Sequence, residues 1–348
     1  MPRSKTGFGV YRNLLLIEYI VSMESKNYNI SIADAITTLQ KQIEDGLPSS
    51  LFSGFDDLDK VTTGWFPGEL CVVGARPGMG KTCFILNVIA NMLTNGDAVA
   101  LFSATDSMNI RFMARVIGIL NNQYVGFSDE KKIELVEQSS VMDIPFYLNL
   151  EPRMSLPFIR ENAIKLVKEK NVKCLFVETI QSISDSEDNG NTKEGMERIC
   201  KELKILAYDL NIPIIVTSEL NRNVEYREGI DGKYPQLCDL RSSSAIEYNA
   251  DSVYLLFRPA YYHILMDENG NDLRYTLKVI VAKNKYGNAG EVNLRYNAMN
   301  STISDMNGAS TKGKESADSQ QEMIAKLKEN ESFQKLQNLL SLEISDED

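Results

Sequence analysis

Zinc ligands are scarce in this chain of 348 residues. It has a single histidine, His263, and its five cysteines stand singly, without a Cys-x-x-Cys pair. A zinc site gathers several such side chains at close spacing, so no zinc site is expected. Unpaired cysteines are typical of proteins that are kept reduced, which predicts a cytoplasmic location.

Long apolar runs and an excess of positive charge are also lacking. Residues 14–21 form an apolar stretch near the start, but it is too short to cross a bilayer and contains Glu18. We therefore expect neither a signal peptide nor a membrane partner. The net charge of -11 argues against a protein that coats nucleic acid by bulk electrostatics, but it leaves room for local basic loops.

The most informative stretch that is present runs from Val72 to Thr82. The apolar residues that end at Val73 indicate a buried strand, and those after Thr82 recur at helical spacing. A strand, a glycine-rich loop and a helix, in this order, are the context of a phosphate-binding loop. The alternative is an ordinary glycine-rich turn, but the Gly-Lys-Thr triplet at 80–82 favours the phosphate-binding loop.

The residue types in this loop match the chemistry of a nucleoside triphosphate with Mg²⁺. Gly78 and Gly80 let backbone N–H groups turn toward phosphate oxygens, and the dipole of the next helix adds to the attraction. Lys81 can reach the β- and γ-phosphates, and the Thr82 hydroxyl can hold Mg²⁺. Ala75 occupies the first glycine position of the strict pattern. The predicted cofactor-binding residues are Arg76, Pro77, Gly78, Met79, Gly80, Lys81, Thr82 and Cys83.

Apolar runs and helical patterns alternate along the rest of the chain. Strands are expected at 98–103, 146–150, 174–178, 212–218, 252–257, 274–282 and 291–296, and helices at 83–93, 108–121, 156–170 and 194–210. This alternation predicts an α/β fold with a mainly parallel sheet and helices on both faces. Residues 221–239 are polar and rich in turn formers, which predicts a loop.

Composition divides the chain into four parts. They are an N-terminal arm at 1–29, a linker helix at 30–48, an ATPase domain at 49–300 and a flexible acidic tail with a candidate helix at 301–348. The linker helix is expected because Ser31 and Asp34 resemble a capping box. The tail is expected to be disordered because it is rich in Ser, Gly, Lys and Asp.

Charged residues stand at the ends of other expected strands. Glu178 ends a strand expected beside the loop strand, where a carboxylate can reach Mg²⁺ through water. Glu219 and Arg222 follow another strand, at a position able to sense the γ-phosphate, and Arg241 opens a further loop. Because ligands of open α/β sheets bind at the carboxyl ends of the strands, these residues are predicted to converge.

These stretches, in their order along the chain, resemble the C-terminal, RecA-like motor domain of the DnaB-type replicative helicases. The matching residues are 54–58, 75–82, 101–103, 218–222, 239–241, 246–247, 250–251 and 282–285. The resemblance covers about residues 30–298 and implies a RecA-like core of the phosphate-loop class. The family's N-terminal helical domain, which docks primase, has no counterpart in residues 1–29, and this favours a phage or mobile element as the source.

The resemblance also implies ligands and partners. ATP and Mg²⁺ would sit at the interfaces of a ring-shaped homo-hexamer, with single-stranded DNA in its channel and a helicase loader or primase as protein partner. Residues 30–48 would pack on the neighbouring subunit, and Lys283 and Lys285 would reach that neighbour's γ-phosphate in trans. Arg222 and Arg241 would lie near DNA.

Four positions around the phosphate depart from the family pattern. Thr105 takes the place of the glutamate that polarises the attacking water, unless a one-residue bulge brings Asp106 there. Glu178 replaces an aspartate, Glu219 replaces a glutamine, and Lys285 replaces an arginine without its bidentate fork. The candidate catalytic residues are Asp106, Glu178, Glu219, Lys283 and Lys285, and the candidate metal ligands are Thr82 and Glu178.

Several of these residues also have structural interpretations. Asp106 can serve only as the N-cap of the following helix, and Glu219 can be an exposed loop acid. Lys283 and Lys285 can be a solvated pair, and Arg241 can bind a carboxylate or a helix C-terminus.

With this resemblance, the sequence predicts an ATP-dependent DNA helicase or translocase of replicative type that acts on single-stranded DNA as a ring. The alternative is a DnaB-like ATP-binding protein with weak or no hydrolysis, which would be a structural or regulatory partner in replication. The four departures favour this alternative, whereas the intact Gly-Lys-Thr at 80–82 favours an active site. A recombination-type or clock-type ATPase is a third interpretation, and residues 220–222 and 239–241 fit the helicase pattern better.

Overall fold

The computed structural model describes residues 31–33, 50–104, 110–120, 144–184, 192–241 and 243–306. The chain divides into two units, Met1–Pro48 and Ser49–Asp348. Within the first unit, Ile32 and Ala33 are helical. The rest of the predicted arm and linker helix lies outside the described residues, as does the predicted tail beyond residue 306.

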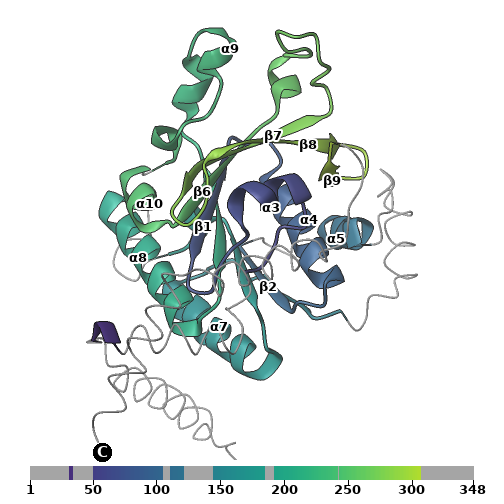
Figure 1. Ribbon diagram of the computed structural model, residues 1–348. Coiled ribbons are helices and arrows are strands. Elements are labelled where there is room, and N and C mark those ends of the chain that lie inside the picture. Colours follow the sequence, from purple (N-terminus) through teal and green to yellow (C-terminus); the bar gives the residue numbers. More distant parts are fainter. Residues whose placement is uncertain are drawn as a thin grey trace, which may run out of the picture. The chain divides into compact units, whose positions relative to one another are not determined.

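The described part of the second unit is built on a sheet of nine strands (Figure 1). The strands are β1 (Leu70–Ala75), β2 (Val99–Ser103), β3 (Phe146–Asn149), β4 (Cys174–Glu178), β5 (Ile214–Glu219), β6 (Ser252–Phe257), β7 (Thr276–Asn284), β8 (Gly290–Asn297) and β9 (Thr302–Asp305). Their order across the sheet is β3-β2-β4-β5-β1-β6-β7-β8-β9. The first six in this order run parallel, and β7, β8 and β9 add antiparallel pairs at one edge. The predicted mostly parallel sheet is confirmed.

The central strands are apolar along their whole length because both faces of the sheet are covered. In β1, Cys71 and Val73 belong to one hydrophobic core. Leu70 and Val72 point the other way and belong to a second core. A strand buried on both faces therefore gives the continuous apolar run seen in the sequence.

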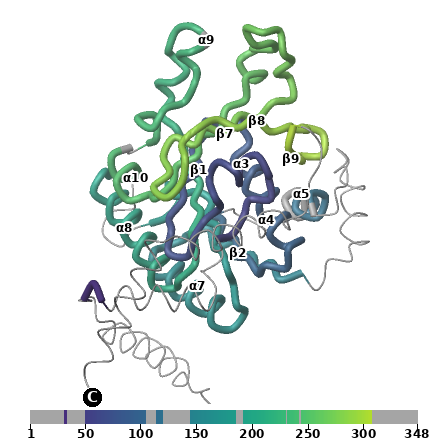
Figure 2. Tube along the Cα trace, in the orientation of Figure 1, coloured from purple at the N-terminus to yellow at the C-terminus, as the bar shows by residue number. Residues whose placement is uncertain are grey.

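Helices form a layer on each face, as Figures 1 and 2 show. The helices are α3 (Asp56–Thr62), α4 (Lys81–Thr94), α5 (Ile110–Leu120), α7 (Leu156–Lys170), α8 (Lys193–Leu210), α9 (Gly229–Gly232) and α10 (Ser243–Asn249). Leu58 of α3, Phe84 of α4 and Val116 of α5 pack into the first core. Leu203 of α8 and Ile246 of α10 pack into the second. Among the described residues, no helix is long and apolar enough to cross a membrane.

Local signals in the sequence explain where the two longest described helices begin and end. The Ser155 hydroxyl accepts a hydrogen bond from the N–H of Phe158 at the start of α7. Thr192 caps α8 in the same way. Each helix ends at an asparagine with a φ of 53°, a left-handed conformation that asparagine tolerates and that stops the helix.

The place of β4 differs from the expectation. Glu178 was expected on a strand beside the loop strand β1, but β5 lies between β4 and β1. Sequence order does not determine this arrangement, because parallel strands joined by helices can be inserted between one another. The strand that carries Glu178 is instead flanked by β2 and β5.

Two segments expected to be irregular are structured. The tail was expected from residue 301, but β9 extends the sheet, with buried Ile303 donating its N–H to Asn87 Oδ1 at 3.0 Å. The Asp305 carboxylate accepts hydrogen bonds from the first N–H groups of α3. The loop expected at 221–239 contains three short helical elements, η3 (Arg222–Tyr226), α9 and η4 (Leu237–Asp239).

Candidate functional site

The loop between β1 and α4 has the conformation that its glycines permit. Gly78 and Gly80 have φ values of 81° and 99°, in the left-handed region that glycine tolerates best. A Cβ atom on Gly78 would lie 2.9 Å from the Tyr261 ring. No side chain caps α4 at Gly80, which leaves the first N–H groups of that helix for an anion.

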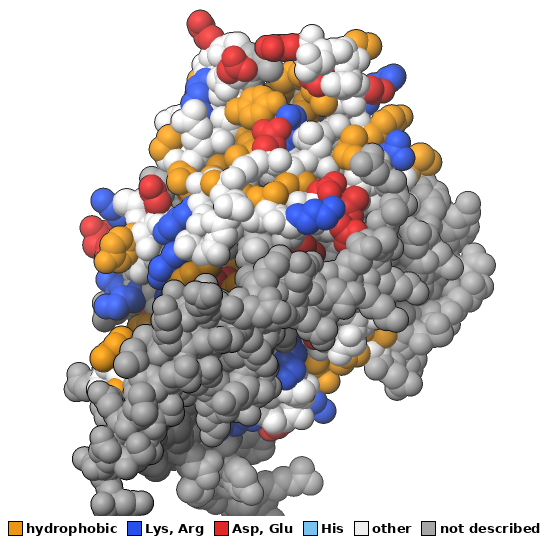
Figure 3. All heavy atoms as spheres, viewed as in Figure 1, with side chains coloured by type: hydrophobic (Ala, Val, Ile, Leu, Met, Phe, Trp, Pro, Cys, Tyr) orange, Lys and Arg blue, Asp and Glu red, His pale blue; other side chains and the backbone are white. Residues whose placement is uncertain are grey.

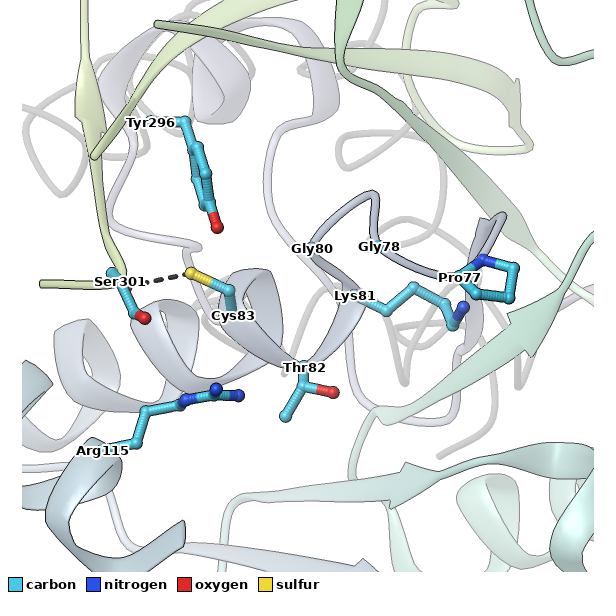
Figure 4. Close-up of a pocket in the computed structure, with 9 residues that line it drawn as sticks. All are labelled: Pro77, Gly78, Gly80, Lys81, Thr82, Cys83, Arg115, Tyr296 and Ser301. Atoms are coloured by element: carbon cyan, nitrogen blue, oxygen red, sulfur yellow. Dashed lines mark hydrogen bonds between the residues drawn. The ribbon is translucent and has the colours of Figure 1, made fainter. Parts of the chain in front are cut away.

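A pocket of about 330 Å³ opens beside this loop, and Figure 4 shows its walls. It is lined by Pro77, Gly78, Gly80, Lys81, Thr82, Cys83, Arg115, Tyr296 and Ser301. All of the predicted cofactor-binding residues except Arg76 and Met79 therefore line one cavity.

Lys81 folds back over the loop. Its ammonium donates a hydrogen bond to the Ala75 carbonyl at 2.9 Å. Burial lowers the pKa of Lys81, while the charges of Glu219 and Glu178 act in the opposite direction. A phosphate group would replace the carbonyl as the partner of this ammonium and would favour its charged form.

Thr82 and Glu178 are joined directly. The Thr82 hydroxyl donates a hydrogen bond to Glu178 Oε1. Burial raises the pKa of Glu178, and the hydrogen bond from Thr82 and the charges of Lys81 and Arg115 oppose that rise. A hydroxyl and a carboxylate are the hard oxygen groups that Mg²⁺ prefers, so the two residues fit this ion.

Glu219 stands next to the start of the loop. In the β1–β5 ladder it pairs with Ala75. Its N–H donates to Gln181 Oε1 at 3.2 Å, and Gln181 in turn donates to the Ser218 hydroxyl at 2.9 Å. Arg241 Nη1 lies 3.6 Å from the Glu219 carboxylate. This carboxylate thus has a cationic partner within the same chain.

Lys283 and Lys285 do not join this group. Lys283 pairs with Val253 in the antiparallel β6–β7 ladder, near the amino ends of the parallel strands, whereas the phosphate loop follows the carboxyl end of β1. The six residues of β1 span roughly 20 Å. Neither lysine can therefore reach the phosphate loop of its own chain.

The contacts of these lysines are local. Lys283 Nζ donates to the carbonyls of Glu247 and Ala250 at the end of α10, at 2.6 Å each. Lys285 Nζ lies 3.6 Å from Asp251 Oδ1 and 5.1 Å from the centre of the Tyr286 ring. Lys283 therefore binds the end of a helix, while the Lys285 side chain remains largely exposed.

Two residues of the loop point away from the pocket. The Arg76 guanidinium donates to the Leu220 carbonyl at 2.9 Å and lies 3.0 Å from Glu225 Oε1. The Met79 side chain is buried in the hydrophobic core. Arg76 thus faces the segment after β5, and neither Arg76 nor Met79 is among the residues that line the pocket.

Of the remaining candidates, the structure describes Arg222 and Arg241 but not Asp106. Asp106 and Thr105 lie outside the described residues. Arg222 is exposed on η3, and Arg241 is exposed at the end of the next loop. On the face drawn in Figure 3, Lys and Arg side chains stand among Asp and Glu side chains, and neither sign dominates its described surface.

Four residues at the pocket were not selected from the sequence. Arg115, Tyr296 and Ser301 line it, and Arg258 lies over the Tyr296 ring, 4.1 Å from its centre. Arg258 also donates to the Gly78 carbonyl at 3.1 Å. Arg258 directly follows an apolar strand, so the strand-end rule could have found it. The other three carry no local signal, because distant segments bring them to the loop.

The sequence matches the family described as "DnaB-like helicase C terminal domain" over residues 50–305. A probable replicative DNA helicase of Trieres chinensis is 28% identical over 314 residues, which make up 83% of this chain and 68% of that protein. The replicative DNA helicase DnaB of Geobacillus stearothermophilus is 31% identical over 261 residues, 72% of this chain and 56% of that protein. The match therefore spans little more than half of the second relative.

Solved structures give the same relationship. The chain is similar to a structure described as an ATPase domain, with a TM-score of 0.66 and 25% identity over 80% of this chain and 99% of that one. It is also similar to a DnaB-like replicative helicase described with its interactions with primase, with a TM-score of 0.65 and 25% identity over 83% of this chain and 71% of that one. The RecA-like ATPase fold is thereby confirmed. The chain belongs to the family of DnaB-like helicase C-terminal domains.

Proposed function

We propose that this protein is an ATP-dependent DNA helicase or translocase of replicative type, which acts on single-stranded DNA as a ring. The observation that carries the proposal is a pocket lined by Lys81 and Thr82, with Glu178 hydrogen-bonded to Thr82, in a chain of this helicase family. These residue types suit a nucleoside triphosphate and Mg²⁺.

The chain's own residues have separate tasks in this proposal. The loop N–H groups and Lys81 hold the phosphates, and Thr82 and Glu178 hold Mg²⁺, which neutralises charge on the phosphate oxygens when bound. Tyr296 and Arg258 form an apolar and cationic wall beside the loop, which suits the nucleoside end of ATP. Asp106 or Glu219 would orient the attacking water.

The positions of Lys283 and Lys285, near the amino ends of the parallel strands, support the proposed ring. Lys285 is largely exposed and cannot reach its own phosphate loop, so a role in hydrolysis requires a neighbouring copy. Six copies, with residues 30–48 as linker helices, would place ATP at each interface. Arg222 and Arg241 would contact single-stranded DNA in the channel.

Partners and location are proposed by analogy with the relatives. One solved relative is described with primase, so a primase or a helicase loader is the proposed protein partner. Work on replicating DNA would take place in the cytoplasm, which agrees with cysteines that are all unpaired.

The test is an ATPase and unwinding assay with the full chain. With Mg²⁺, we expect hydrolysis that single-stranded DNA stimulates, and unwinding of a forked duplex. Lys81→Ala should abolish both activities. ATP binding without hydrolysis, in an intact oligomer with DNA present, would instead establish the alternative, a DnaB-like structural or regulatory partner.

A further inference from the structure

An ion pair joins the phosphate loop to the segment that follows β5. Arg76 Nε lies 3.0 Å from Glu225 Oε1 in η3. A second bond runs from Arg76 Nη1 to the Leu220 carbonyl, at 2.9 Å. The two side chains are 21% and 31% exposed, so the pair is shielded from much of the solvent. An ion pair in such a setting interacts more strongly than one on the open surface.

Glu225 holds further contacts besides Arg76. The Tyr262 hydroxyl donates to Glu225 Oε1 at 3.2 Å, and Lys233 Nζ donates to the Glu225 carbonyl at 2.7 Å. Tyr262 belongs to the short helix η5 (Pro259–Tyr262), and Lys233 follows α9. Glu225 is thus the residue at which η3, η5, the α9 region and the phosphate loop meet.

Hydrogen bonds and an ion pair also join the start of this segment, after β5, to its end at residues 239–241. The Arg227 guanidinium pairs with the buried Asp239 carboxylate. The Asn221 N–H donates to the Asp239 carbonyl at 2.7 Å, and the Arg241 N–H donates to the Glu219 carbonyl at 3.1 Å. These non-covalent contacts hold the two ends of residues 221–241 together, so the segment would shift as one unit.

Exposed residues of this segment suit a nucleic acid. Arg222 is exposed, and Tyr226, next to Glu225, is 74% exposed. A cation and an aromatic ring are the pair with which proteins hold phosphates and stack bases of single strands. Figure 1 shows the part with α9 projecting beyond the sheet.

We propose that Glu225 is a positioning residue that couples DNA bound on residues 221–241 to the nucleotide held by the phosphate loop. The proposal rests on the proposed function and adds to it the side chain through which the two ligands act on each other. A shift of η3 on binding DNA pulls or releases Arg76, and with it the loop that ends in Lys81. The coupling is reciprocal, so nucleotide in the pocket changes the affinity for DNA.

The test compares DNA affinity with and without nucleotide in Glu225→Gln. Anisotropy of a labelled single strand is measured with Mg²⁺, with and without a non-hydrolysable ATP analogue. In the parent, the analogue should change the dissociation constant by about fivefold or more. In Glu225→Gln the change should fall toward unity, while affinity without nucleotide is kept because Arg222 and Arg241 are intact.

Control variants separate coupling from a structural effect. Glu228→Gln removes the same charge from an exposed position of the segment, and its DNA affinity should respond to the analogue by the same factor as that of the parent. Glu225→Asp keeps the charge and should retain part of the coupling. In a double-mutant cycle, Glu225→Gln added to Arg76→Gln should cause no further loss.

Two results would overturn the inference: unchanged coupling in Glu225→Gln, or a parent whose DNA affinity does not respond to the analogue. The readout does not need hydrolysis. A parent that binds both ligands but does not hydrolyse ATP would therefore refute the proposed function alone, and the analogue-dependent affinities would still decide the role of Glu225.

Discussion

The Thr82 hydroxyl, in the first turn of α4, donates a hydrogen bond to the Glu178 carboxylate at the end of β4. The contact forms although β1 and β4 are not neighbours in the sheet. α4 contacts both β1 and β2, so it lies across β5 and β4, which stand between them. The helix that begins at the phosphate loop therefore brings its own hydroxyl to the carboxylate.

Removing the charge of Glu178 should weaken the binding of Mg²⁺ specifically. Glu178→Gln keeps an acceptor for Thr82 but loses the negative charge that would hold the metal's water shell. The Mg²⁺ concentration for half-maximal ATPase should rise about tenfold or more, as for other residues that support metal ligands. Glu197→Gln, an exposed change on α8, is the matched control. An unaltered Mg²⁺ titration would remove Glu178 from the metal site.

Lys81→Ala should weaken ATP binding. The variant removes the ammonium that would neutralise β- and γ-phosphate oxygens. We expect Mg-ATP affinity to fall at least about tenfold, equivalent to about 1.4 kcal/mol. Calorimetry measures this directly, with the exposed Lys168→Ala as the control. Equal affinities in parent and Lys81→Ala would show that the pocket is not the nucleotide site.

The elements with strong local patterns could be predicted from the sequence. The bounds predicted for 156–170, 174–178 and 252–257 are those of α7, β4 and β6. Each is set by nearby residues, a Ser cap for the helix and unbroken apolar runs for the buried strands. The phosphate loop was equally visible, because its glycines, Lys81 and Thr82 are contiguous.

Features that depend on distant partners could not be predicted. Tyr296 reaches the pocket only because the antiparallel strands add to the sheet beyond β6. β9 lies in a stretch of disordered composition, yet Asn87 and the start of α3 give it partners. Arg76 belongs to the predicted loop, but its ion pair with Glu225 spans 149 residues and has no signature in either segment.

Asp59 should make the stability of the second unit depend on pH. Its buried carboxylate accepts hydrogen bonds from Ser53 and Gly54, and burial raises the pKa of Asp59 to about 7, against about 3.9 in an unfolded chain. The folded state holds the Asp59 proton more tightly than the unfolded chain does. The contribution of this proton to the free energy of unfolding is therefore complete below about pH 4 and is lost as the pH rises through 7.

The measurement is the free energy of unfolding of the parent minus that of Asp59→Asn, from urea denaturation between about pH 5 and pH 8. Asparagine does not titrate, so the difference should fall with rising pH, by at most about 1.4 kcal/mol for each pH unit. A difference that stays constant over this range would show that Asp59 is already ionised in the folded protein.

Asp106 and Glu219 are rivals for the role of general base. Glu219 is already paired with Arg241 at 3.6 Å, which favours Asp106. Asp106→Asn should leave ATP binding nearly intact and lower hydrolysis by ~10²-fold or more, the usual range for loss of a base. Glu219→Gln should preserve or raise the rate, because it removes a negative charge that acts on Lys81 and would repel a phosphate held there. The reverse pattern of rates would assign the role to Glu219.

Lys285 and Lys81 should act in different chains of one oligomer. Lys285 lies toward the amino ends of the parallel strands and Lys81 follows the carboxyl end of β1, so a shared site needs two copies. Lys81→Ala and Lys285→Ala should each be inactive alone. When they are mixed and reassembled, about one interface in four combines an intact loop with an intact lysine from the neighbour. ATPase activity should then reappear. Mixing either variant with the double variant Lys81→Ala/Lys285→Ala creates no such interface and should restore no activity.

Light scattering checks that the mixed oligomers form. No recovery in intact mixed oligomers would mean that Lys285 does not complete a neighbour's site.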